Sequence, residues 1–170
     1  MIELVLIAGM IILTSRASLI NDNLTIVLQL HQYRLWAIIY MIITTVYLAY
    51  RFITLFHQSV DGKRYDRLVI ITSIIMILGI LCPYNENRHD LWSQIHVYAS
   101  LYGCLVCLFM GLLLLKSLYL SGRSVNNLFA GIVLMSMIIL ASIIQCGGIS
   151  GISEILTLIT ILAVLRIAST

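Results

Sequence analysis

Six apolar segments, separated by short polar ones, follow one another along the whole chain. A helix needs about 20 apolar residues to cross a hydrocarbon core about 30 Å thick, so the chain has room for six crossings and almost nothing else. The expected spans are about 2–20, 35–57, 68–82, 95–115, 128–144 and 155–168. The sequence therefore predicts an all-α, polytopic transmembrane helical bundle, with residues 1–170 forming a single integral membrane domain.

Composition excludes an ordinary soluble fold. Hydrophobic residues make up 61% of the chain and charged residues 10%, whereas soluble domains carry roughly 45–50% apolar and about 25% charged residues. The lipid bilayer is therefore the expected first partner, and other membrane proteins or a second copy of this chain are further ones. No P-loop or basic nucleic-acid patch occurs in the sequence, so nucleic acid is not an expected partner.

The first apolar segment is short for a crossing. Its uninterrupted run ends at Thr14, and it extends to residue 20 only if the Arg16 side chain reaches the headgroups. A cleaved signal peptide is the alternative, but such peptides begin with cations, and this chain carries Glu3 there. We therefore expect a short or tilted first span.

Lysine and arginine in the loops predict the orientation, because the side with more cations near the span ends is the cytoplasmic one. With six spans, the loops on the side of the two termini, together with the C-terminal end, carry Lys63, Arg64, Arg67, Lys116, Arg123 and Arg166. The opposite loops carry Arg16, Arg34 and Arg88. This imbalance predicts that both termini lie in the cytoplasm. Without the first span, only the N-terminus would change sides.

The polar loop before the fourth span holds the densest set of titratable side chains. Its candidate site residues are Glu86, His89, Asp90 and His96. His31, in the first external loop, is expected on the same side of the membrane. Imidazole and carboxylate groups bind zinc and other transition metals, so a metal or ligand site is one interpretation, although the H-E-x-x-H spacing is absent. Contact with a polar headgroup and simple solvation or helix capping are the alternatives.

Glu154 is a candidate for handling ions, because it lies beside a glycine-rich corner at the start of the last span. Arg166 lies twelve residues further on, near the other end, which is about 18 Å away along a helix. The two side chains therefore cannot pair. An interfacial anchor is the alternative role for each.

Small and aromatic residues predict where helices pack. Gly103 and Gly111 are eight residues apart, about two helical turns, so they share one face on which another backbone can approach closely. Tyr33, Tyr40 and Tyr47 are seven apart and lie along one helical stripe. Such a stripe favours a packing seam or an interfacial anchor over a ligand cage.

Two motifs flank the loop between the third and fourth spans: Cys82–Pro83–Tyr84 before it and Ser93–Gln94–Ile95–His96–Val97–Tyr98–Ala99 after it. Together they resemble the Frag1/DRAM/Sfk1 group of membrane proteins and its bacterial relatives. The resemblance implies a six-helix membrane protein, from a group with members linked to lipid organisation, and it marks His96 as the position to test.

The leading hypothesis for function is a non-enzymatic membrane protein that acts through contacts with lipid or with partner helices, because the strongest sequence signals concern membrane residence. A small transporter or permease component is the first alternative. A membrane enzyme that uses the external cluster of histidines and carboxylates is the second.

Overall fold

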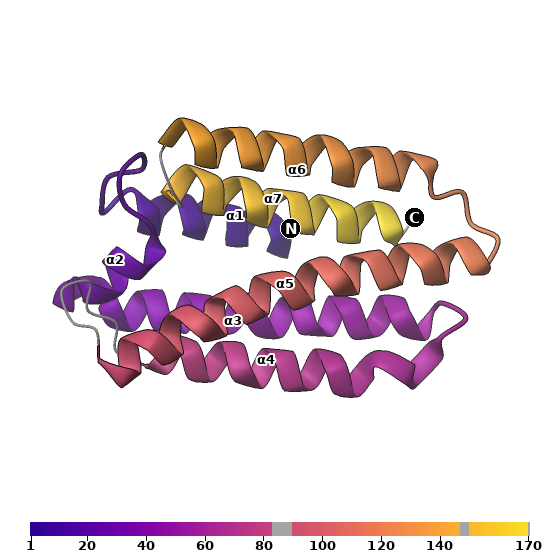
Figure 1. Ribbon diagram of the computed structural model, residues 1–170, viewed down its shortest axis with the longest axis horizontal. Helices are drawn as coiled ribbons and strands as arrows, with labels where there is room; N and C mark the ends of the chain where they lie inside the picture. The colour runs from indigo at the N-terminus through magenta and orange to yellow at the C-terminus, as the bar shows by residue number, and fades with distance from the viewer. Residues whose placement is uncertain (83–89, 147–149, 170) are drawn as a thin grey trace. The chain divides into compact units, whose positions relative to one another are not determined.

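A computed structural model describes residues 1–82, 90–146 and 150–169 (Figure 1). Within these ranges the chain is all-helical and contains no β-strand, which confirms the predicted class of secondary structure. The α-helices are α1 (Ile2–Thr14), α2 (Leu24–Gln29), α3 (His31–His57), α4 (Asp66–Leu81), α5 (Leu91–Leu120), α6 (Asn126–Cys146) and α7 (Gly151–Ala168). A short 3-10 helix, Gly62–Tyr65, precedes α4.

Three of these helices, α3, α5 and α7, are long and apolar enough to cross a membrane. The length and apolar composition of these helices are those of a membrane protein, as the sequence predicts. The apolar helix α1 and the apolar centre of α6, residues 128–141, are shorter.

The first helix ends earlier than the predicted segment, at Thr14 and not near residue 20. The Thr14 hydroxyl donates back to the Met10 carbonyl at 2.7 Å, and the Ser15 hydroxyl donates to the Ile12 carbonyl at 2.7 Å. After Thr14 the backbone closes tighter 3-10-type turns, such as that from the Ala17 N–H to the Thr14 carbonyl. Hydroxyl side chains that bond locally compete with the helix, which explains the early end.

The described chain forms two compact units. Unit 1 comprises Met1–Tyr40 and Asn127–Ala168, and unit 2 comprises Met41–Asn126. The division falls inside α3, after Tyr40.

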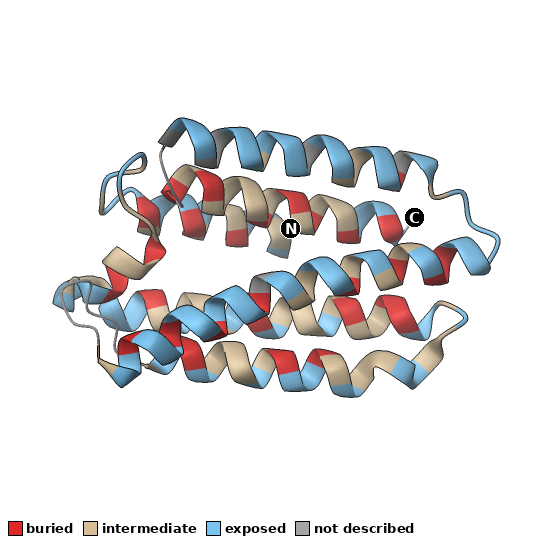
Figure 2. Cartoon of the chain, in the orientation of Figure 1, coloured by how far each residue is buried: buried red, intermediate tan, exposed pale blue. Residues whose placement is uncertain are grey.

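In unit 1, α1 packs against α7. Leu6, Met10 and Thr14, at spacings of four, form the buried face of α1. Tyr40 also contacts α1: its hydroxyl donates to the Leu6 carbonyl at 2.8 Å, and its ring fills the space beside Gly9. Tyr40 is therefore a packing residue. In contrast, α6 exposes most of its described side chains (Figure 2).

In unit 2, α4 and α5 pack against each other more extensively than any other pair of helices in the described chain. A Cβ on Gly79 would lie 2.6 Å from the Ala99 Cβ, and a Cβ on Gly103 would lie 2.7 Å from the Met76 Cγ. The two backbones therefore approach closely at Gly79 and Gly103. At Gly111 no neighbouring helix approaches closely, because a Cβ there would meet nothing within 4 Å. Of the two glycines expected to share a packing face, only Gly103 makes a contact.

Candidate functional site

The start of α7 in unit 1 is bonded to the segment that joins α1 to α2. The Gly151 N–H donates to the Asp22 carbonyl at 2.7 Å, and the Ile152 N–H donates to the Leu19 carbonyl at 3.2 Å. The first N–H groups of a helix have no partner within the helix. Here carbonyls from far along the chain accept them, so the segment around residues 19–22 is fixed to α7.

Glu154 makes the reciprocal bond. Its Oε2 accepts a hydrogen bond from the Leu24 N–H, the first of α2, at 2.7 Å. The Asn23 side chain accepts from the Ile26 N–H at 3.3 Å and caps the same short helix. A carboxylate near a helix N-terminus accepts strong, charge-assisted bonds. We name these contacts the corner clasp; it consists of Leu19, Asp22, Leu24, Gly151, Ile152 and Glu154.

Two buried serines set the first residue of α7. The Ser153 N–H donates to the Ser150 Oγ at 3.4 Å, and the Ser150 N–H donates to the Ser153 Oγ at 2.9 Å. This reciprocal cap satisfies two N–H groups at once, as a capping box does. The sequence-based prediction did not include this cap, although a serine three residues before another at the start of an apolar segment was the available signal.

His96 lies in the contact between α4 and α5 of unit 2. Its side chain is 3% exposed, and its Nδ1 lies 2.9 Å from the Gly79 carbonyl oxygen. Because a carbonyl only accepts, Nδ1 must carry the hydrogen in this contact. Gly79 is the third residue from the end of α4, and its carbonyl also accepts from the Cys82 N–H at 3.2 Å. His96 therefore joins the two helices at one of the places where they approach closely.

The other residues of the predicted cluster have roles of their own or lie outside the described residues. The Asp90 carboxylate caps α5 by accepting from the Ser93 N–H at 2.8 Å, which agrees with the capping alternative. His31 begins α3, is exposed and belongs to unit 1. Glu86 and His89 lie outside the described residues. Within the described ranges, no three histidine, cysteine or acidic side chains gather in a way that could hold a metal ion. A zinc or other transition-metal site stays a prediction.

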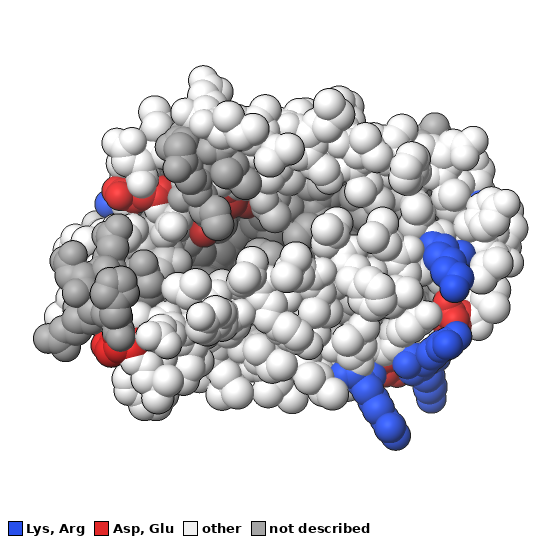
Figure 3. All heavy atoms as spheres, viewed as in Figure 1, with Lys and Arg blue, Asp and Glu red and all other residues white. Residues whose placement is uncertain are grey.

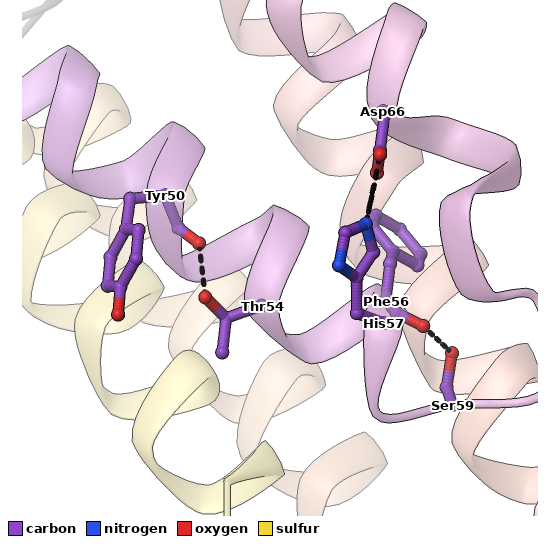
Figure 4. A network of polar contacts seen from close by, with 6 residues as sticks. All are labelled: Tyr50, Thr54, Phe56, His57, Ser59 and Asp66. Atoms are coloured by element: carbon purple, nitrogen blue, oxygen red, sulfur yellow. Dashed lines mark hydrogen bonds and ion pairs between the residues drawn. The ribbon is translucent and has the colours of Figure 1, made fainter.

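A second polar contact of unit 2 closes the turn between α3 and α4 (Figure 4). The His57 Nε2 lies 2.9 Å from both carboxylate oxygens of Asp66, the first residue of α4. The Ser59 hydroxyl donates to the Phe56 carbonyl at 2.8 Å, and the Phe56 ring is fully buried. Sequence analysis did not single out this pair, because its two members belong to different helices.

Comparison with protein-family models, with curated proteins and with solved structures finds no match. The resemblance to the Frag1/DRAM/Sfk1 group stays a prediction that rests on the two short motifs. Of these, Pro83 and Tyr84 lie outside the described residues. His96, the position that the resemblance marks, has the buried interhelical role described above.

We expect His96→Leu to lower the free energy of unfolding by about 0.5–2 kcal/mol, the range for a buried hydrogen bond between helices. His96→Asn keeps an N–H donor near the position of Nδ1 and should lose less. Reversible unfolding in mixed micelles measures both. Equal losses for the two variants would show that the contact with the Gly79 carbonyl contributes nothing.

Proposed function

We propose that this chain is a six-span integral membrane protein with both termini in the cytoplasm. In this proposal α1, α3, α4, α5, α6 and α7 are the spans, and α2 lies at the membrane surface. The protein acts without catalysis, through contacts with lipid and with partner helices. The resemblance to a group with members linked to lipid organisation is consistent with this role.

The exposed apolar surface of α5 is the observation that carries the proposal. The side chains of Leu105, Phe109 and Leu112 are 59%, 51% and 47% exposed, in the middle of the helix. Lys116 is the only Lys, Arg, Asp or Glu in its 30 residues. Soluble monomers rarely expose apolar patches larger than a few hundred Å². Hydrocarbon, however, solvates such a surface at no cost. The helix α5 is also long enough to cross, because its length of about 45 Å exceeds the thickness of the hydrocarbon core.

The distribution of cations supports the orientation. Lys63, Arg64 and Arg67 follow α3, and Lys116 and Arg123 lie at the end of α5. These positions belong to the same side in a six-span arrangement. The rule that cations mark the cytoplasmic side assigns these positions to the cytoplasm.

Extraction of membranes at alkaline pH tests membrane residence. We expect the full chain to stay in the membrane pellet after carbonate treatment and to enter solution only with detergent, because its apolar helices have no other suitable solvent. A peripheral protein of the same membranes, released by the same treatment, is the control. Appearance of this chain in the detergent-free supernatant would contradict the proposal.

Transport is a second candidate function, and one observation favours it. Of the three helices long enough to cross a membrane, only α7 carries an acidic residue, Glu154. Ionisable residues within spans often lie on ion or proton pathways. Substitutions of Glu154 separate this function from a structural one, as described in the Discussion.

A further inference from the structure

Five cations of unit 2 lie at one end of that unit. Two contacts place them there: the Ser117 hydroxyl donates to the Ser59 Oγ at 2.7 Å, and the Val60 N–H donates to the Ser121 Oγ at 3.2 Å. The turn after α3 is therefore held against the end of α5. We name the cations on these two segments the basic face; they are Lys63, Arg64, Arg67, Lys116 and Arg123, and all five are exposed.

The basic face carries excess positive charge. Two carboxylates lie near it, and both are engaged: Asp61 pairs with Arg64 at 3.4 Å, and Asp66 pairs with His57. Within the part of the chain that the structure describes, Lys63, Arg67 and Lys116 have no carboxylate partner. Figure 3 shows Lys and Arg side chains gathered at the right-hand edge of the space-filling view.

Aromatic side chains hold the segment that carries these cations. The Tyr65 ring packs on the buried Phe56 ring with 4.9 Å between centroids, and the Arg64 guanidinium lies 5.6 Å from the Tyr65 centroid. Tyr119, near the end of α5, is 67% exposed. Tyrosine is enriched where a membrane protein meets the headgroups. The basic face thus combines cations on a fixed turn with an aromatic residue suited to the interface.

We propose that the basic face binds the headgroups of anionic phospholipids in the leaflet beside it. The proposal rests on the proposed membrane function and names the lipid class that this end of unit 2 selects. Clusters of cations next to a span attract anionic lipids over distances of about a Debye length, roughly 8 Å at physiological salt. The apolar surface of α5 contacts the acyl chains, and the basic face contacts the phosphate and carboxylate groups above them.

The test uses the purified full chain in a neutral detergent. It is titrated with phosphatidylserine and, separately, with phosphatidylcholine of the same acyl chains, and the unfolding temperature is followed. We expect a larger rise with phosphatidylserine and a smaller difference at high salt. An equal response to the two lipids would overturn the proposal. So would an equal rise with inorganic phosphate, because the site would then bind a free anion.

A matched pair of variants locates the binding. Lys63→Gln with Arg67→Gln removes two unpaired cations of the basic face. Arg16→Gln with Arg34→Gln removes the same charge from unit 1. We expect the first variant to weaken apparent binding of phosphatidylserine about 30-fold and the second less than about 3-fold, given the usual contribution of each cation near a membrane. Equal weakening by both variants would place the binding elsewhere.

Carbonate extraction of the membranes from which the chain is purified separates this proposal from the proposed function. A wild-type chain that stays in the membrane pellet but shows no preference for phosphatidylserine overturns the lipid selectivity alone. A chain that leaves the membrane overturns both.

Discussion

Gly79→Ala is expected to lower the free energy of unfolding by about 1–3 kcal/mol, the usual cost of overpacking a close contact. A methyl group at this position would lie 2.6 Å from the Ala99 Cβ, which belongs to a short side chain that cannot rotate away. The helices α4 and α5 must therefore separate. Their separation also lengthens the 2.9 Å contact between the His96 Nδ1 and the Gly79 carbonyl. Reversible unfolding in mixed micelles measures the loss.

Two further variants make this prediction specific. Ala99→Gly in the Gly79→Ala background moves the single methyl group to the opposite helix and should restore most of the lost stability. Gly111→Ala is the control, because a Cβ there meets nothing within 4 Å and alanine favours helix by about 1 kcal/mol over glycine. Similar losses for Gly79→Ala and Gly111→Ala, or no restoration by Ala99→Gly, would contradict the close approach.

Glu154→Ala is expected to open the corner clasp and to cost about 1–3 kcal/mol, the penalty for a buried donor left without an acceptor. The donor is the Leu24 N–H, which now lies 2.7 Å from the Glu154 carboxylate. The connecting segment before α2 should then be released from α7 more often, because only the backbone bonds from Gly151 and Ile152 still hold it. Faster cleavage by trypsin after Arg16, together with a lower unfolding temperature, would record that release.

Glu154→Gln is the matched variant, because its amide oxygen still accepts a hydrogen bond but the group does not ionise. If Glu154 serves only the corner clasp, we expect the glutamine variant to keep most of the stability and its resistance to trypsin. If Glu154 handles ions, the glutamine variant should keep its stability and lose ion flux in reconstituted vesicles. Equal destabilisation by alanine and glutamine would contradict the role of the carboxylate oxygen as the acceptor.

The positions of the helices could be predicted from the sequence because runs of apolar residues determine them. The helix α6 begins and ends within two residues of the predicted boundaries, whereas α5 begins four residues before and ends five residues after the predicted segment 95–115. The helix α1 ends at Thr14, where the uninterrupted apolar run also ends. The predicted extension to residue 20 was wrong because the hydroxyls of Thr14 and Ser15 bond to nearby carbonyls and the chain leaves the helix there. The number of crossings and their orientation stay predictions.

The surroundings of the candidate residues were harder to predict, because they depend on partners far along the chain. Helical spacing tells which residues share a face of α5 with His96, but it does not say which face meets α4. The absence of a side chain at Gly79 allows that face to approach and buries His96. The partner of Glu154 is 130 residues away in the chain, at Leu24, so no local pattern could indicate it.

The central claim is that the apolar helices cross a bilayer in an alternating, six-span arrangement. Labelling of single cysteines with a membrane-impermeant thiol reagent tests it most directly. The four native cysteines are first replaced, and Lys63→Cys, Arg88→Cys and Arg123→Cys are then introduced one at a time. In sealed vesicles, positions 63 and 123 should be labelled from one side, the cytoplasmic one, and position 88 only from the other. Labelling of positions 63 and 88 from the same side of an intact membrane would contradict the account.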